Sequence, residues 1–405
     1  MKRKLLLSGI IAAFSLSSFA QDGNKAYAIT GKANGTFNWT DIREIDLSTG
    51  KVVNTIFEEG KTAFSYTNTM QKVTVSASGG GPTSSMVAAA AFDSRHGKLF
   101  FAPMRSGELV WLDVTTRNQP KFYSEGQRLL TGVDVNDEAN NFTRMTIGAD
   151  GNGYAITNDA NHLVMFTTGK KTVITDLGNL VDDQANKGIS VHNKCSSWGG
   201  DIVADAYGNL YLFSASHNVF KIDLKNRVTT LVATVTGLSG TYTVNGAAVD
   251  NADNVVISSA NSFEGFYRVN MKDFSATKLE TTGPVFNASD LANANLLFSG
   301  KVKNTLGSAQ LSKLETLGNE FISIYPNPVA GRDFRVTFDK NASGVYNIIL
   351  TDLQGRLVMT KQVYVNTSAH IEPMHLATKP SAGLYLIHIT DANKKSVFSD
   401  KIVIN

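Results

Sequence analysis

The stretch DIVADAYGNLYLF, residues 201–213, has the pattern of two short strands joined by a tight turn. Small and β-branched residues lead to Asp205, and apolar and aromatic residues resume at Leu210. Between them, Asp, Asn and Gly tolerate the positive φ angles of short hairpin turns, and an Asp side chain closes such a turn through its own backbone. We therefore predict a β-hairpin that turns at Asp205.

The same pattern recurs between residues 22 and about 310. The copies are AAAAFDSRHGKLFF, MTIGADGNGYAI, DIVADAYGNLYLF, GAAVDNADNVVI and NASDLANANLLF, and their aspartates are Asp93, Asp150, Asp205, Asp250 and Asp290. Most copies continue into a third and a fourth strand, for example NVFKIDLKNRVTTLVAT. Four strands repeated every 40 to 57 residues indicate the blades of a β-propeller, with a β-sandwich or a β-helix as alternatives.

We predict six blades, although residues 58–85 are irregular and the last copy is short. The first segment begins with YAIT, which matches the second strand of a repeat. We therefore expect the C-terminal copy to pair with the N-terminal strands and close the ring. Residues 203–232, VADAYGNLYLFSASHNVFKIDLKNRVTTLV, resemble a blade of the six-bladed propellers related to NHL-repeat and TolB-like proteins. That resemblance implies a fold and no function.

The charge balance gives no electrostatic reason to expect nucleic acid as a partner. Of the 38 basic residues, Lys2, Arg3 and Lys4 lie at the N-terminus, which leaves 35 (38 − 3) against 35 acidic residues. Cys195 is the one cysteine, so the chain forms no internal disulfide. No stretch after the N-terminal segment is long and apolar enough to predict a transmembrane helix.

Residues 1–20, MKRKLLLSGIIAAFSLSSFA, have the pattern of a secretory signal peptide. A basic tip precedes an apolar run, and small residues occupy the positions before a cleavage point between Ala20 and Gln21. The apolar run is too short for a membrane anchor. We therefore predict export to the periplasm.

The last 83 residues differ in pattern from the repeats. FRVTFD, VYNIILTD, RLVMTKQ, GLYLIHIT and SVFSDKIVIN are short alternating strands separated by turn residues. They predict a small immunoglobulin-like β-sandwich. The expected domains are a signal peptide (1–20), a propeller (21–310), a linker (311–322) and this C-terminal domain (323–405).

Four motifs in order make this tail similar to the type A C-terminal sorting domain of the type IX secretion system. They are YPNP, GVYNI with DLQGR, SAGLY and the terminal KIVIN, and they contain Tyr325, Pro326, Asn327, Pro328, Gly344, Gly355, Gly383, Tyr385 and Lys401. The resemblance implies recognition by the type IX secretion machinery and its sortase. It further implies a protein that is attached to the surface or released, from a Gram-negative bacterium of the Bacteroidota type.

The repeats contain no sequence-local catalytic cluster. Propellers bind ligands at the mouth of the central channel, and Arg144, Asp201, Asn245 and Asn287 lie near the starts of the predicted inner strands. These four are our candidate ligand-binding residues. We expect Trp39 and Trp198 on the opposite face, where their rings would be able to stack on sugars.

Two motifs favour structural interpretations over metal binding. His192 and Cys195 have a metal-like spacing without a second pair, and Asp150-Gly-Asn152-Gly lacks the later ligands of a calcium loop. We predict no metal and no cofactor. The function indicated is an exported propeller that binds a glycan, a peptide or a protein. The alternative is a metal-assisted hydrolase or lyase that uses Asp201, Asn245 and Asn287.

Overall fold

The structure is a computed structural model that describes residues 24–32, 35–77, 80–116, 119–299 and, with short gaps, 322–404. The gaps in the last range are residues 328, 330, 340–342, 353–356, 367–368, 377–379, 382 and 393–395. The expected signal peptide with Ala20 and Gln21, the linker up to residue 321, Pro328 and Gly355 lie outside the described residues. The chain forms two compact units, Met1–Asn304 and Thr305–Asn405.

Five sheets form the first unit, each built on four antiparallel strands; the four are consecutive in the chain in all but the first sheet, where β23 joins β1, β2 and β3. From the inner strand outward, the first sheet contains β23 (Ala288–Ala292), β1 (Lys25–Thr30), β2 (Asp41–Asp46) and β3 (Val52–Phe57), and the second contains β6 (Val87–Asp93), β7 (Lys98–Pro103), β8 (Glu108–Asp113) and β9 (Lys121–Arg128). The third contains β10 (Phe142–Ile147), β11 (Gly153–Thr157), β12 (Leu163–Phe166) and β13 (Ile174–Gly178), and the fourth contains β15 (Asp201–Ala204), β16 (Asn209–Phe213), β17 (Asn218–Asp223) and β18 (Val228–Thr234). The fifth contains β19 (Gly246–Val249), β20 (Val255–Ser258), β21 (Tyr267–Val269) and β22 (Ala276–Lys278). The unit also contains η1 (Glu138–Asn140), η2 (Gln184–Asn186) and α1 (Lys194–Ser197). Within the described ranges, no helix is long and apolar enough to cross a membrane.

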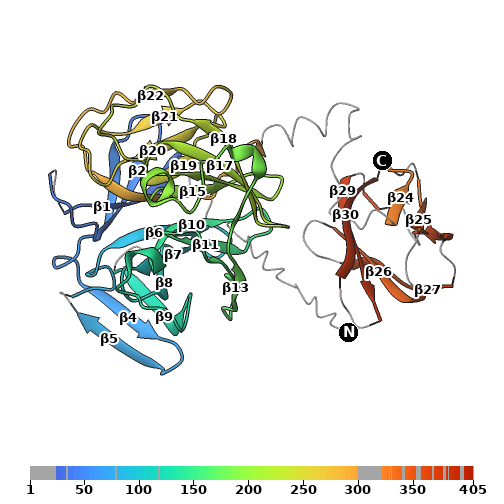
Figure 1. The fold of residues 1–405 in the computed structure, drawn as a ribbon. Coiled ribbons are helices and arrows are strands. Elements are labelled where there is room, and N and C mark those ends of the chain that lie inside the picture. Colours follow the sequence, from blue (N-terminus) through green and yellow to red (C-terminus); the bar gives the residue numbers. More distant parts are fainter. Residues whose placement is uncertain are drawn as a thin grey trace, which may run out of the picture. The chain divides into compact units, whose positions relative to one another are not determined.

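The inner strands contact one another in a closed cycle: β6 with β10, β10 with β15, β15 with β19, β19 with β23 and β23 with β6. They lie near the middle of the first unit, whereas β5, β13 and β22 lie at its outside (Figure 1). This is the arrangement of blades in a β-propeller. The predicted ring closure is confirmed, because β23 pairs antiparallel with β1 and brings Ala292 opposite Tyr27.

A separate hydrophobic cluster fills each of the five spaces between neighbouring sheets. Strand alternation explains this, because successive side chains point to opposite faces of a sheet. In β6, Ala90 and Phe92 belong to the cluster shared with β1 and β2, while Ala89 and Ala91 belong to the cluster shared with β10 and β11. Each sheet is therefore buried on both faces, and small residues let the inner strands approach one another.

The described residues form five such sheets, so our expectation of six blades was wrong. Residues 58–85 contribute β4 (Phe64–Asn68) and β5 (Val73–Ala77), and β4 pairs in parallel with the outer strand β9. This hairpin extends an existing sheet at its edge. A second short addition, β14 (Val181–Asp182), pairs with β18 in the same way.

Aspartates close most of the predicted hairpin turns. Asp205 Oδ1 accepts hydrogen bonds from the backbone N–H groups of Tyr207 at 2.9 Å and Asn209 at 2.8 Å. Asp150 accepts from the N–H of Asn152 at 3.1 Å, which agrees with a turn at that position. Asp290 is the exception, because it lies inside β23 and is fully buried.

The second unit contains two sheets. One has the strand order β24 (Ile322–Tyr325), β25 (Asp333–Asp339), β28 (Ala369–His375). The other has the order β27 (Leu357–Val365), β26 (Gly344–Asp352), β29 (Gly383–Asp391), β30 (Ser396–Ile404). Both sheets contribute to one hydrophobic core, which includes Phe334 and Phe338 from one sheet and Ile348, Ile387 and Ile402 from the other. Two sheets around a shared core form a β-sandwich.

The YPNP segment ties the start of this unit to its last strand. Tyr325 ends the edge strand β24, and Asn327 contacts β30. Asn327 Nδ2 donates to the carbonyl of Lys401 at 2.9 Å, and Asn327 Oδ1 accepts from the N–H of Val403 at 2.9 Å. Two residues later, the N–H of Val329 donates to the carbonyl of Val403 at 2.7 Å.

We expect Asn327→Ala to release the edge of β30, because it removes both side-chain hydrogen bonds. Hydrogen exchange at the Val403 amide should accelerate by up to about thirtyfold in the full chain, since each of the two bonds contributes about 1 kcal/mol. Asn347→Ala is the matched control, because its side chain accepts only from the exposed Gln362 amide. Equal exchange at Val403 in the two variants contradicts the proposed tie.

Candidate functional site

A cavity of about 270 Å³ opens at the end of the ring where the inner strands begin. We call it the mouth cavity. Each inner strand contributes one residue within one position of its first residue: Ala88, Thr143, Gly200, Asn245 and Ser289. The remaining lining residues are Trp39, Met104, Glu138, Asn141, Asn158, Trp198, Gly199, Ala215 and Ala260.

Two half-buried tryptophans line the mouth cavity together with the strand starts. Our expectation that Trp39 and Trp198 occupy the opposite face was therefore wrong. The indole N–H of Trp39 donates to the carbonyl of Ala260 at 3.1 Å, and that of Trp198 donates to the carbonyl of His192 at 2.9 Å. Both rings are thus held in place by the backbone, and their polar atoms are already paired.

The lining amides differ in how far their hydrogen bonds are used. Asn141 accepts from Arg105 N–H and donates to two carbonyls, so it ties a loop together. Asn245 Oδ1 accepts from Thr243 Oγ1 at 2.7 Å and from the N–H of Ala260 at 3.0 Å. Asn158 Nδ2 donates to the carbonyl of Glu138 at 3.4 Å, whereas Asn245 Nδ2 donates to no residue that the structure describes.

Arg144 lies behind the cavity wall and is fully buried on β10. Its guanidinium donates four hydrogen bonds of 2.7–3.3 Å to the backbone carbonyls of Thr157, Asn158, Ser197 and Gly199. Burial lowers the pKa of Arg144 to about 10, and nearby carboxylates oppose that change. The side chain remains charged at neutral pH and joins the wall of β11 to the loop before β15.

Two buried carboxyl groups lie deeper, on the inner strands. Asp201 accepts from the N–H groups of Ile202 at 2.7 Å and Ala247 at 2.8 Å. The oxygens of Asp290 have no hydrogen-bond partner among the described residues. Burial raises the pKa of both carboxyls well above the ordinary value, and the charge of Asp201 adds to the rise at Asp290.

Asn287 also supports the wall from behind. Its Nδ2 donates to the carbonyl of Ala260 at 2.6 Å, and its Oδ1 is buried without a hydrogen-bond partner among the residues that the structure describes. Of the four predicted ligand-binding residues, Asn245 therefore lines the cavity, Arg144 and Asn287 hold lining backbone, and Asp201 lies deeper. A direct role in ligand binding for any of them remains a prediction.

In the part of the chain that the structure describes, no three His, Cys, Asp or Glu side chains lie close enough together to hold a metal ion. Both ring nitrogens of His192 hydrogen-bond to backbone carbonyls, at 2.8 Å to Asp159 and 3.0 Å to Leu180. Cys195 is exposed. His192 thus holds backbone beside α1, and Cys195 lies in α1, so their spacing in the sequence has a structural explanation.

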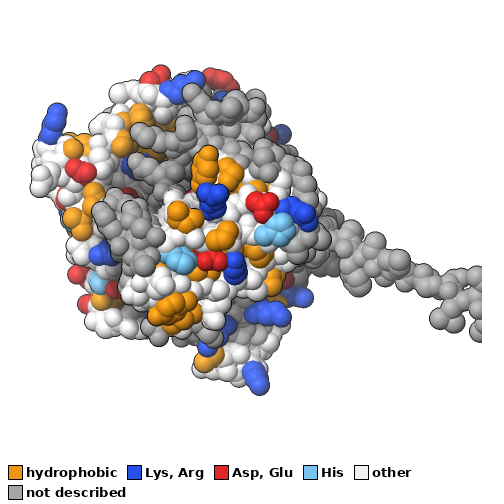
Figure 2. Space-filling view, turned by 90° about the vertical axis from the view of Figure 1, so that its right-hand side faces the viewer, with side chains coloured by type: hydrophobic (Ala, Val, Ile, Leu, Met, Phe, Trp, Pro, Cys, Tyr) orange, Lys and Arg blue, Asp and Glu red, His pale blue; other side chains and the backbone are white. Residues whose placement is uncertain are grey.

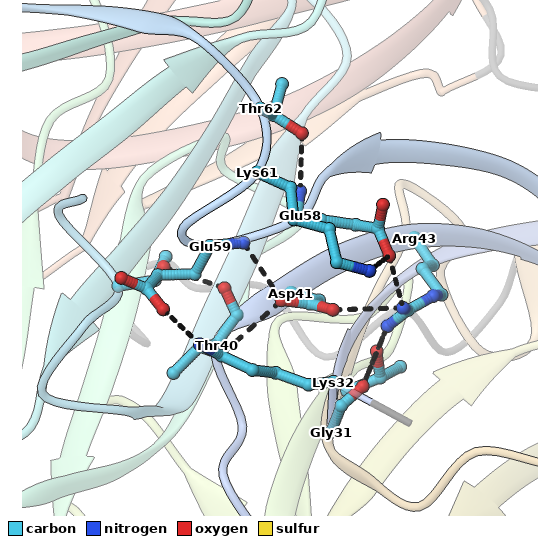
Figure 3. A network of polar contacts seen from close by, with 11 residues as sticks. Gly31, Lys32, Thr40, Asp41, Arg43, Glu58, Glu59, Lys61 and Thr62 are labelled. Atoms are coloured by element: carbon cyan, nitrogen blue, oxygen red, sulfur yellow. Dashed lines mark hydrogen bonds and ion pairs between the residues drawn. The ribbon is translucent and has the colours of Figure 1, made fainter. Parts of the chain in front are cut away.

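A buried polar network supports the loop that carries Trp39 (Figure 3). The Arg43 guanidinium pairs with Asp41 at 2.9 Å, donates to the carbonyl of Gly31 at 2.9 Å and lies 4.1 Å from the ring centre of Phe286. Burial raises the pKa of Asp41, although Arg43 and the Glu59 N–H oppose the rise. This network fixes the connection between β1 and β2 beside the mouth cavity.

The surface drawn in Figure 2 shows hydrophobic side chains in small groups among Lys, Arg, Asp, Glu and His side chains. Such scattering is ordinary for the surface of a folded protein. A concave site with fixed aromatic rings is the better candidate for recognition. The mouth cavity is such a site.

Residues 323–405 match the family of the secretion system C-terminal sorting domain. The chain carries a C-terminal sorting domain. This agrees with the resemblance seen in the four terminal motifs. Within that domain, Gly344 and Gly383 begin strands, Tyr385 is buried and donates its hydroxyl to the carbonyl of Ser381 at 2.7 Å, and Tyr325 is exposed.

Solved structures that resemble the chain include PorZ, a surface component of the type IX secretion system of Porphyromonas gingivalis, with 15% identity and a TM-score of 0.32 over 94% of this chain and 51% of that chain. The chain thus spans about half the length of PorZ. A streptogramin B lyase has 10% identity and a TM-score of 0.37 over 67% of this chain and 85% of that chain. Virginiamycin B lyase from Staphylococcus aureus has 11% identity and a TM-score of 0.34 over 95% of this chain and 97% of that chain. Similarities this low assign no activity to this chain. No curated protein matches it.

Proposed function

We propose that this protein is cargo of the type IX secretion system and acts outside the cell as a binding protein. The sorting-domain match at residues 323–405 supports export. In this proposal, residues 1–20 direct passage to the periplasm and are removed before Gln21. The immunoglobulin-like sandwich is then recognised at the outer membrane, and the protein is attached to the surface or released.

The cargo in this proposal is a five-bladed propeller, and its ligand enters the mouth cavity. The observation that supports binding most directly is the pair of indole rings, each held by a hydrogen bond to backbone, on a cavity lined by all five sheets. Fixed aromatic rings provide contact area at low conformational cost. The buried network of Arg144 keeps the cavity wall rigid without contacting a ligand itself.

Deleting residues 323–405 should leave the propeller in the periplasm, because the signal for the outer-membrane step is lost. The experiment expresses the full chain and the truncated chain in a host with a type IX system. Cell fractionation and protease treatment of intact cells then locate each protein. We expect surface or medium to contain nearly all of the full chain and almost none of the truncated chain.

Correct folding of the truncated chain is the control for this experiment. All three tryptophans, Trp39, Trp111 and Trp198, lie in the first unit, so their emission reports its fold. Matching emission and thermal unfolding in the two proteins exclude misfolding as the cause of retention. A truncated chain that still reaches the surface contradicts the proposed export route.

A further inference from the structure

Building on the proposed function, we infer that the mouth cavity binds a neutral carbohydrate, with a sugar ring against Trp39 or Trp198 and a hydroxyl oxygen at Asn245. The inference rests on three properties of the lining: its charge, the state of its aromatic rings and the amide of Asn245, whose Nδ2 has no acceptor among the described residues. The cavity volume of about 270 Å³ is near the lower end of the range for small-molecule sites, about 300–1,000 Å³.

The lining is close to neutral. Glu138 is its one charged side chain, and Glu138 pairs with Lys194 at 2.9 Å. Both partners are about two-thirds exposed, so the pair is a loose contact at the rim. An anionic ligand would meet no unpaired cation in this lining, and a cationic ligand would compete with Lys194 for Glu138. The charge pattern therefore favours an uncharged ligand.

The aromatic rings present carbon surface. Both indole N–H groups already donate to backbone carbonyls, so a ligand gains contact with ring faces and little else from these residues. Lys194 lies over the Trp198 ring, 4.8 Å from its centre, so a sugar would use the remaining ring surface or displace this exposed side chain. The polarised C–H groups of a sugar ring suit the same surface.

Asn245 adds the polar contact. Its Oδ1 is held by Thr243 Oγ1 and the N–H of Ala260, which fixes the plane of the amide. Its Nδ2 has no acceptor among the described residues although the residue is half-buried and lines the cavity. A hydroxyl oxygen of a sugar satisfies this donor. A backbone carbonyl of a peptide would satisfy this donor as well, so uncharged peptides form a separate arm of the test.

Tryptophan emission of the full mature chain provides the test, because two of its three tryptophans line the cavity and Trp111 does not. The neutral probes are methyl glycosides of glucose, galactose, mannose and N-acetylglucosamine, with cello-, malto- and chito-oligosaccharides. Glucuronate and glucose 6-phosphate form the anionic arm. Uncharged, end-blocked aliphatic peptides form the third arm. Calorimetry measures affinity for any probe that shifts the emission.

We expect at least one neutral saccharide to bind and the anionic sugars to bind more weakly. Trp198→Phe and Trp39→Phe should each reduce affinity, by up to about tenfold, as aromatic contacts in proteins contribute. Asn245→Leu removes every polar atom of this side chain at similar volume and should reduce affinity about three- to tenfold, with thermal unfolding to show that the loss of the Ala260 contact leaves the fold intact. Trp111→Phe is the matched control with unchanged affinity, because Trp111 stacks on Tyr123 outside the cavity.

The outcomes separate this inference from the proposed function. Tighter binding in the peptide arm or the anionic arm overturns the carbohydrate and leaves a binding protein. Saccharide binding that all three cavity variants retain at full affinity places the sugar elsewhere and overturns the site. A chain that binds no probe in any arm overturns the carbohydrate and the ligand-binding role of the mouth cavity, while the truncation experiment still decides export independently.

Discussion

Replacing Arg144 by methionine is expected to lower the free energy of unfolding of the first unit by about 3–5 kcal/mol. The substitution keeps much of the side-chain volume, but it removes a fully buried charge that donates to four backbone carbonyls. Those carbonyls lose the guanidinium as a partner, although the Thr157 carbonyl keeps the N–H of Ala160 at 2.9 Å, and Asp201 loses a nearby positive charge. Denaturant unfolding followed by tryptophan emission measures the effect on this unit.

Arg95→Met is the matched control. Its side chain is 50% exposed, so water replaces part of what is lost. It pairs with the buried Asp93 at 3.0 Å and also donates to the carbonyl of Gly151 and to Thr168 Oγ1. Its removal should therefore cost about 1–2 kcal/mol, less than at Arg144. Arg144→Lys should fall between the two, because an ammonium retains the charge but has three donors for four carbonyls. A loss at Arg144→Met no larger than that at Arg95→Met would show that the buried hydrogen bonds contribute little.

The repeat and its closure were predictable because hairpin chemistry is local. The Asp205 turn and its apolar flanks occupy one short window, and the same chemistry recurs in the neighbouring copies. The number of sheets was not predictable in the same way. Residues 58–85 contain strands like those of a repeat, and whether they form a sheet or extend one depends on the parallel pairing of β4 with β9. That pairing is a contact between segments distant in sequence.

Asp290 shows how alignment by residue type fails. Its copy, NASDLANANLLF, places an aspartate where the other copies have a turn. In the structure the strand continues through Asp290 to Ala292, and the side chain is buried at the inner edge of the ring. Sequence pattern alone does not distinguish a turn aspartate from a buried one when both follow small residues.

The mouth cavity was predictable in position and only partly in composition. Strand starts converge at one end of any propeller, which is why Asn245 was a candidate. Arg144 was chosen by the same rule, but the four carbonyls that it faces come from loops distant in sequence. Trp39 and Trp198 lie in loops whose direction depends on such contacts. A tryptophan shortly before an inner strand, as at Trp198 before β15, is the signal that would have identified the wall.

Asp290→Asn is expected to stabilise the first unit at neutral and alkaline pH, by about 1–3 kcal/mol, the usual cost of a buried polar group without a partner. By hydrogen-bond geometry the Asp290 oxygens have no partner among the described residues. The backbone N–H of Ala90 opposes the rise in the Asp290 pKa less than burial and the charge of the nearby Asp201 cause it. The asparagine amide has nearly the same shape and carries no charge. It also supplies N–H donors for a neighbouring carboxylate.

The pH dependence identifies the cause of this gain. Burial raises the pKa of Asp290 in the folded state, so the fold holds its proton more tightly than the unfolded chain does. That contribution to stability is complete below the unfolded pKa of about 3.9 and is lost as the pH rises through the folded pKa. The advantage of Asp290→Asn should therefore be small near pH 4 and grow toward pH 8. Glu280→Gln, an exposed carboxyl on the same unit, is the control without such growth. Unfolding curves at several pH values decide the matter, and an advantage that is constant with pH would assign the effect to packing instead of the buried charge.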